Sequence, residues 1–289
     1  MGKVFNGTDL CSVLVSILLK VCKAKGLNPI HMICWNYAIA SLLCFYWFKP
    51  DLGHVSPSNT PWWLILSLGM LLPSVFLCLS KSLQTAGIVK TEVAQRLSVV
   101  LSLGAAYFIF NEQFGTLKLI GIGLGVIAVL CIIYSHRATN SYSSVSTSGM
   151  FYLASVWVGY ALVDILLKYT TGLGVQFSVA LNLMFICAFV FSLLYVVLTT
   201  KQIGSATNIL FGLCLGVLNF ANIALYVKAH MLLKDSPAIV FAGMNILVVS
   251  LGVLSGFIFF KEKLKTTTSL GLGLGIMSVL CLAYAMTVS

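Results

Sequence analysis

The sequence predicts an all-α membrane protein in which ten transmembrane helices form two inverted five-helix repeats. Its composition is apolar: 60% of the 289 residues are hydrophobic and 8% are charged, whereas a soluble domain carries about 25% charged residues. Apolar runs that are long enough to cross a bilayer occur ten times. One stretch also occurs twice, at residues 110–134 and 260–284, with an offset of 150 residues and no gap.

The two copies of this stretch read FNEQFGTLKLIGIGLGVIAVLCIIY and FKEKLKTTTSLGLGLGIMSVLCLAY. They share a glutamate, three glycines, a cysteine and a tyrosine in one register. The shared pairs are Glu112 with Glu262, Gly121 with Gly271, Gly123 with Gly273, Gly125 with Gly275, Cys131 with Cys281, and Tyr134 with Tyr284. Chance rarely produces such a match, so we interpret it as an internal repeat. Glycines four residues apart favour close packing between membrane helices.

Taken in order along the chain, the ten predicted spans follow the apolar runs. They cover residues 5–24, 30–48, 61–83, 87–110, 116–135, 149–168, 175–199, 207–230, 237–260 and 267–287. A polar linker, residues 138–148, separates a first repeat over 1–137 from a second over 149–289. Since each repeat contains an odd number of spans, two tandem copies cross the membrane in opposite senses, as in many secondary transporters.

The repeat extends beyond the stretch that defines it. Residues 17–20 (ILLK) recur as residues 165–168, and Asn36 has a counterpart in Asn182. Gly69 and Lys81 match Gly216 and Lys228 at an offset of 147.

Charge and cysteine usage exclude several classes of partner. The formal net charge is +10, but the 17 lysines and arginines are scattered singly between apolar runs. They suit lipid headgroups and topology signals, so we expect membrane lipids and no nucleic acid as partners. The nine cysteines lie in apolar runs without CxxC pairs, which favours small packing residues over disulfides or metal ligands. We expect no cofactor and no metal.

Ten spans as five plus five, a glutamate after spans four and nine, and glycine-rich fifth and tenth spans resemble the drug/metabolite transporter superfamily. Within it the chain is similar to an EamA-type permease over nearly its whole length. The most specific parts are the two repeated stretches and the lysines that end spans one and six, Lys20 and Lys168. The resemblance implies a multi-pass protein of the cell membrane, specifically the bacterial inner membrane. Such a protein exports or exchanges small metabolites, amino acids or drugs without nucleotide hydrolysis, as a monomer or homodimer.

Two specialised mechanisms of related families do not carry over directly. Small multidrug-resistance exporters have a proton-coupling glutamate two turns before the lysine of the first helix, and here those positions hold Ser12 and Tyr160. Sugar-phosphate translocators use basic residues late in the chain, and predicted spans nine and ten contain none. Coupling to protons or other ions therefore stays open.

Ionisable residues inside the spans are the first candidates for a functional site, because such groups are costly in a membrane unless they are paired. Glu92 and Arg96 in span four, like Asp164 and Lys168 in span six, are four residues apart, so each pair can close its own salt bridge. Either both pairs are structural, or one lines a central cavity and exchanges partners when substrate or a proton arrives. The resemblance favours Glu92 and Arg96, because helix four of each half faces the cavity in this family.

Uncharged polar residues in the spans complete the candidate site. An asparagine in a span either bonds another helix or faces a polar cavity. The predicted substrate-binding residues are Glu92, Arg96, Asn36, Tyr160, Asp164, Asn182, Asn219, Asn222 and Asn245.

The sequence thus favours a secondary transporter of small organic solutes over two alternatives. An integral-membrane enzyme acting on a lipid-like substrate would need clustered carboxylates, or histidine beside them. The four histidines are dispersed, and aspartate and glutamate total seven. A receptor or scaffold would need a docking domain, which the short loops do not provide. We therefore expect a transporter and not an enzyme.

The orientation in the membrane is predicted differently by two criteria. The family orientation places both termini in the cytoplasm, together with Lys3, Lys49, Lys118 and Lys234. It leaves eight basic residues on the other side: Lys23, Lys25, Lys90, Arg137, Lys201, Lys261, Lys263 and Lys265. This distribution opposes the positive-inside rule. We keep the family orientation, because inverted repeats tolerate a weak charge bias.

Overall fold

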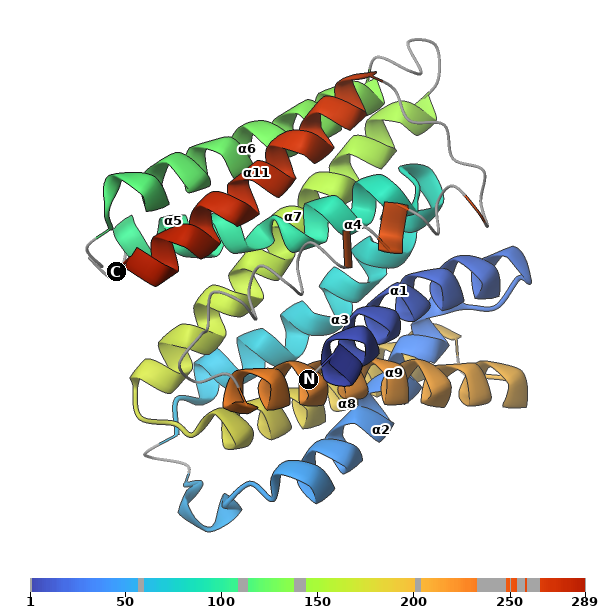
Figure 1. Ribbon diagram of the computed structural model, residues 1–289. Helices are drawn as coiled ribbons and strands as arrows, with labels where there is room; N and C mark the ends of the chain where they lie inside the picture. The colour runs from blue at the N-terminus through green and yellow to red at the C-terminus, as the bar shows by residue number, and fades with distance from the viewer. Residues whose placement is uncertain are drawn as a thin grey trace.

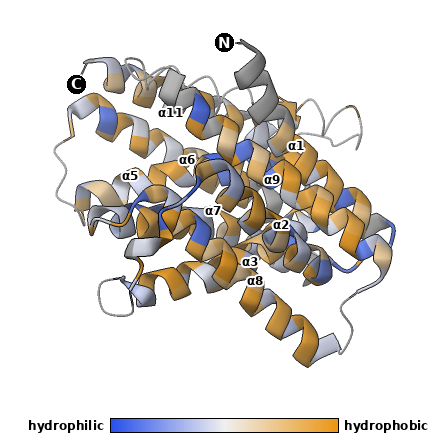
Figure 2. Cartoon of the chain, turned by 90° about the horizontal axis from the view of Figure 1, so that it is seen from below, coloured by the Kyte–Doolittle hydropathy of each residue, from blue (hydrophilic) through white to orange (hydrophobic). Residues whose placement is uncertain are grey.

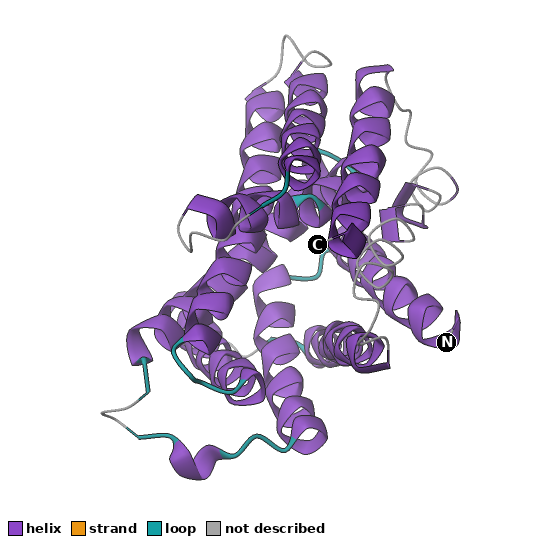
Figure 3. Ribbon diagram, turned by 60° about the vertical axis from the view of Figure 1, so that its left-hand side comes forward, coloured by secondary structure: helices purple, strands orange, loops and turns teal. Residues whose placement is uncertain are grey.

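The computed structural model of the chain is helical throughout the part that it describes (Figures 1 and 3). The described residues are 2–56, 60–108, 114–137, 144–200, 204–232, 248–249, 251–253, 258 and 266–288. Within these ranges the structure contains no strand. The elements with assigned bounds are α1 (Gly2–Ala24), α2 (Pro29–Phe48), the 3-10 helix η1 (Leu52–His54), α3 (Trp62–Thr85), α4 (Ile88–Arg96), α5 (Ser98–Phe108), α6 (Thr116–Arg137), α7 (Ser144–Gly172), α8 (Phe177–Thr200), α9 (Ala206–Leu232) and α11 (Thr266–Val288).

Seven of the described helices are long and apolar enough to cross a membrane: α2, α3, α6, α7, α8, α9 and α11. Helix α1 adds a shorter apolar segment, Cys11–Cys22. Figure 2 shows hydrophobic residues along these helices with few hydrophilic interruptions. The protein is therefore a multi-pass membrane protein.

Most helices overlap the predicted spans, with local differences. Predicted span nine lies largely outside the described residues. Helix α7 begins at Ser144, so the end of the predicted linker 138–148 is helical.

The prediction of one continuous helix over 87–110 is wrong, because the structure divides this span at Leu97 into α4 and α5. The Leu97 carbonyl accepts hydrogen bonds from the amide of Val100 (3.1 Å) and from Nε1 of Trp157 on α7 (3.0 Å). The Ser98 hydroxyl donates to the Gln95 carbonyl at 2.7 Å. Side chains that bond backbone carbonyls in this way interrupt the regular i to i−4 pattern.

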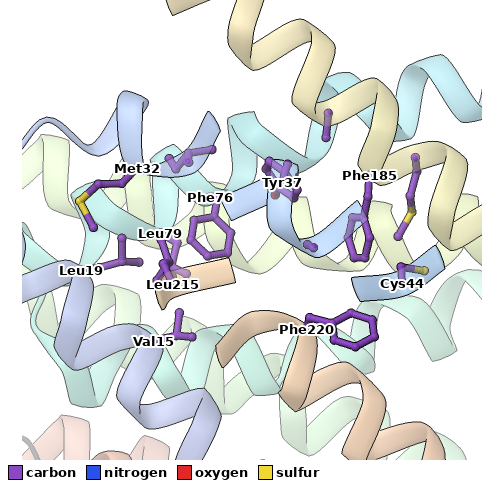
Figure 4. Close-up of a cluster of buried hydrophobic side chains, with 14 of the residues drawn as sticks. Val15, Leu19, Met32, Tyr37, Cys44, Phe76, Leu79, Phe185, Leu215 and Phe220 are labelled. Atoms are coloured by element: carbon purple, nitrogen blue, oxygen red, sulfur yellow. The ribbon is translucent and has the colours of Figure 1, made fainter. Parts of the chain in front are cut away.

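The apolar side chains form two buried clusters. The first joins α1, α2, α3, α8 and α9, with Tyr37 and Phe185 among its largest members (Figure 4). The second joins α4, α5, α6 and α11 around Leu97 and Ile132. Helix α7 contributes to both clusters, through Val156 to the first and Trp157 to the second. It therefore links the two groups of helices that Figure 1 shows.

The repeated stretches pack on each other reciprocally. Helices α6 and α11 lie side by side (Figure 1), and a Cβ atom on Gly121 would lie 2.9 Å from the Leu282 side chain. A Cβ atom on Gly271 would lie 2.7 Å from Ile132. The two contacts are equivalent under the repeat. Gly121 corresponds to Gly271 and Ile132 corresponds to Leu282, each at an offset of 150 residues. The N-terminal part of each helix meets the C-terminal part of the other, so the helices run antiparallel.

A second pair of glycines behaves in the same way. A Cβ atom on Gly69 of α3 would lie 2.4 Å from Cys187 of α8, and one on Gly216 of α9 would lie 2.2 Å from Ile39 of α2. Gly69 and Gly216, which correspond to each other in the predicted repeat, therefore both lie at close contacts between two helices. All nine cysteines are free thiols.

Candidate functional site

Helix α4 places Glu92 and Arg96 in the protein interior, one turn apart. The Glu92 side chain is fully buried, whereas Arg96 is partly buried. Gly252 approaches Glu92 so closely that a Cβ atom there would lie 3.0 Å from the Glu92 Cγ. Arg96 lines a small cavity of about 10 Å³, the space of about one water molecule. The other lining residues described are apolar and come mainly from α4 and α11.

Two serines of α1 bind these charged side chains. The Ser16 hydroxyl donates to Glu92 Oε1, and Arg96 Nη2 donates to the Ser12 hydroxyl. Both serines are buried and lie one turn apart, so successive turns of α1 bind the two charged side chains. The expected salt bridge within α4 is not formed: the hydrogen bonds of Glu92 and Arg96 in the described structure go to α1 instead.

Sequence reasoning missed the role of the two serines. It noted Ser12 only as the replacement of a proton-coupling acid. The available signal was spacing, because serines at 12 and 16 match the four-residue spacing of Glu92 and Arg96.

Each charged side chain keeps one buried atom without a hydrogen bond. These atoms are Glu92 Oε2 and Arg96 Nε. Buried polar atoms are almost always hydrogen-bonded, and unpaired ones in native structures often belong to functional sites. The pair can therefore still accept and donate hydrogen bonds.

Helix α7 brings two more predicted residues to this site. Asp164 Oδ2 accepts a hydrogen bond from the Ser102 hydroxyl of α5 at 3.3 Å, and the charge of Arg96 acts on Asp164. Tyr160 lies one turn before Asp164 and interacts electrostatically with Glu92, Arg96 and Asp164. The structure thus brings together four of the nine predicted residues, from α4 and α7.

The predicted asparagines bond helices to one another. Asn36 Oδ1 on α2 accepts from Asn219 Nδ2 on α9 at 3.3 Å, and Asn182 Nδ2 on α8 donates to the Ser41 carbonyl at 3.0 Å. Asn36 and Asn182 are both buried. Asn222 on α9 is partly buried, and Asn245 lies outside the described residues. The contacts seen for Asn36, Asn182 and Asn219 therefore fit the helix-bonding alternative.

The charged residues lie at the boundary between the two apolar clusters. Val15 and Leu19, which flank the Ser16 turn of α1, belong to the first cluster, whereas Val93 and Leu97 belong to the second. Tyr160 packs against the first cluster. A boundary between two packed bodies is where relative movement disturbs the fewest apolar contacts. Within the described residues, no group of three or more His, Cys, Asp or Glu side chains could hold a metal ion.

Comparisons with known proteins indicate the family and the fold of the chain. A family model described as "EamA-like transporter family" matches residues 8–134. A protein of Haemophilus influenzae (strain Rd), described as an uncharacterized protein, is 38% identical over 282 residues, which is 95% of each chain. A crystal structure titled only as that of a protein superposes with a TM-score of 0.53 at 12% identity. The superposition covers 96% of this chain and 97% of the chain in that crystal structure. At this level of identity it indicates only that the two folds are similar.

Proposed function

Because the chain belongs to the EamA-like transporter family, we propose that it is a secondary transporter that exports or exchanges small organic metabolites. Transport proceeds by alternating access between two inverted five-helix repeats, residues 1–137 and 149–289, joined by residues 138–148. The reciprocal contacts of α6 with α11 support this arrangement, because an inverted repeat generates paired contacts of that kind. The membrane proposed is the bacterial inner membrane.

The observation that carries the proposal is the placement of two oppositely charged residues, Glu92 and Arg96, one turn apart on α4 in the interior of the protein. Glu92 and Arg96 lie between the two apolar clusters, next to the break at Leu97, and each retains a buried atom without a partner. Broken helices inside membranes are tolerated where they line a cavity, and in transporters they form binding sites. The equivalent positions of the second repeat, Ala242 and Ile246, carry no charge. A purely architectural pair would be expected in both halves.

Arg96 serves as the counter-charge for a carboxylate or phosphate of the solute. Glu92 supplies the opposite charge one turn away when the site is empty, while the hydroxyls of Ser12 and Ser16 bind Arg96 and Glu92 respectively. A solute anion that replaces these contacts would satisfy the Arg96 guanidinium and remove the hydrogen bond between Arg96 and Ser12 of α1.

The transported solute is found first by a thermal-shift screen of metabolites on the purified protein. A ligand at 100 times its dissociation constant stabilises the folded protein by about 2.7 kcal/mol. Uptake of the solutes found into proteoliposomes then tests transport directly. A set of stabilising solutes of which none is taken up would contradict a transporter.

The decisive experiment compares Arg96→Gln with the double variant Glu92→Gln, Arg96→Gln. Removing one partner of a buried pair costs about 3–5 kcal/mol, so the single variant folds poorly if the pair is structural, and the double variant then recovers stability and uptake together. If the pair binds solute, the double variant is folded and inserted but does not transport. Size-exclusion profiles report folding, and Asp51→Asn in the loop after α2 is the control with unchanged uptake. Wild-type uptake by the double variant would overturn the proposal.

A further inference from the structure

The polar site holds two carboxylates but only one guanidinium. Glu92 and Asp164 both lie in helices of the apolar core, and the charge of Arg96 acts on each of them. If both carboxylates are ionised, Arg96 can neutralise only one of them, and the next basic residue along α7 is Lys168, one turn after Asp164. An uncompensated charge inside a membrane is costly, so one carboxylate is expected to bind a positive charge.

Asp164 is the carboxylate with the weaker compensation. Glu92 is fully buried, accepts a hydrogen bond from Ser16 and lies one turn before Arg96. Asp164 receives a longer bond, 3.3 Å, from a Ser102 hydroxyl that also lies 3.3 Å from the Ser98 carbonyl. Its side chain is exposed on α7, whereas that of Glu92 is enclosed.

The repeat gives Asp164 a counterpart with different surroundings. Residues 17–20 match 165–168, so Ser16 occupies the position of Asp164 in the first half. Ser16 is 1% exposed, whereas Asp164 is exposed. When two inverted repeats exchange conformations, equivalent positions exchange their surroundings. Asp164 would then become as enclosed as Ser16 is here, and burial favours the neutral form of a carboxyl group.

We propose that Asp164 is the proton-binding residue of the transport cycle. Its carboxylate forms an O–H bond with a proton taken from water on one side of the membrane. The neutral acid passes through the conformational change, and the proton returns to water on the other side. This inference rests on the proposed function, since a proton crosses only if the two halves alternate.

The groups around Asp164 are compatible with this role. Arg96 of α4 and Tyr160 of α7 act on it electrostatically, and Glu92 acts on Tyr160. Lys168 follows it by one turn on α7. In the elements packed against α7, Lys81 of α3 lies over the Tyr152 ring at 5.1 Å, and Lys118 of α6 lies over the Phe114 ring at 3.9 Å. Described residues 98–108 of α5 and 177–200 of α8 contain no charged side chain.

The test uses dicyclohexylcarbodiimide on the purified wild-type protein, with labelled residues located by mass spectrometry. This reagent adds to protonated carboxyl groups in apolar surroundings. We expect Asp164 to be labelled, with a rate that falls about tenfold per pH unit on the alkaline side of its midpoint. Asp51, a carboxylate in the exposed loop after α2, serves as the internal control and stays unlabelled at neutral pH. Labelling of Glu92 in place of Asp164, or no label on Asp164 from about pH 5 upward, would overturn the inference.

A transport experiment separates this inference from the proposed function. Uptake of a solute from the thermal-shift screen is measured with and without an imposed proton gradient. We expect the ratio of the two rates to fall to about one in Asp164→Asn, to recover in Asp164→Glu and to stay at the wild-type value in Asp51→Asn. An unchanged ratio in Asp164→Asn, or a loss of the response that Asp164→Glu does not restore, contradicts proton binding at Asp164. If Asp164 is labelled but no solute is taken up, the transport proposal fails and with it the role of Asp164 in a transport cycle, while protonation of the Asp164 carboxyl group itself stands.

Discussion

At the scale of single residues, the glycines of α6 and α11 differ in what surrounds them. A Cβ atom on Gly121 would lie 2.9 Å from Leu282, and one on Gly125 would lie 2.3 Å from Val100. Gly123, between them on the same helix, has no neighbouring atom within 4 Å of that position, and its counterpart Gly273 is equally open. Three glycines that look equivalent in the sequence thus include two at helix contacts and one at an open position.

The substitution Gly121→Leu is expected to lower the folded yield, because the added side chain meets Leu282 and the backbone behind it. Overpacking typically costs about 1–3 kcal/mol. Gly271→Leu should have the same effect against Ile132 and the Ala128 carbonyl. The measurement is the monodisperse fraction in size-exclusion chromatography, with Gly123→Leu as the matched control that keeps a normal yield. A Gly121→Leu protein that folded normally but transported a different solute would place this helix in the binding site.

At the scale of elements, the division of span four depends on a neighbouring helix. Leu97 separates α4 from α5 directly after Arg96, and the Trp157 indole of α7 donates to the Leu97 carbonyl. Trp157 is 8% exposed and belongs to the same apolar cluster as Leu97. Helix α7 therefore fixes where span four breaks and hence where Arg96 lies.

The substitution Trp157→Phe removes this hydrogen bond while it keeps an aromatic ring in place. We expect a loss of about 1 kcal/mol in stability, because the Leu97 carbonyl still accepts from Val100. We also expect reduced solute uptake, because the position of Arg96 is no longer held. Trp62→Phe is the matched control: its indole donates to the Ser56 carbonyl at 3.1 Å, beside the loop after α2. If both variants took up solute equally well, the hydrogen bond to Leu97 would have no part in transport.

At the scale of the whole molecule, the antiparallel packing of α6 on α11 fits two halves that cross the membrane in opposite senses. With both termini in the cytoplasm, five spans bring the end of α6 and the start of α7 to the outer face. This orientation is a prediction from the family resemblance, and the distribution of basic residues opposes it.

A cysteine placed at His136, near the end of α6, tests the orientation. The experiment uses a variant in which the nine native cysteines are replaced, since all of them are free thiols. We expect an impermeant maleimide to label this position in intact cells. Protection in intact cells, with labelling only after the membrane is permeabilised, would place both termini outside.

The all-helical, membrane-spanning character of the chain was predictable because its signals are local along the chain. A span is an unbroken apolar run, and the repeat is a direct match between residues 110–134 and 260–284. The choice of Glu92 and Arg96 was equally local, since charged residues are rare in apolar spans. The break at Leu97 was not predictable, because an indole from a helix 60 residues away binds its carbonyl.

The sequence by itself determined that this protein lies in a membrane, contains an internal repeat and carries a few charged residues in its apolar helices. These properties follow from composition and spacing, which need no knowledge of which helices touch. The tertiary structure alone decided the partners. Ser16 is separated from Glu92 by 76 residues and Ser12 from Arg96 by 84, and only the tertiary fold brings these side chains within hydrogen-bonding distance. Which side chains meet between distant helices depends on how the apolar faces of those helices pack against each other. That packing cannot be read from the residue type at any one position.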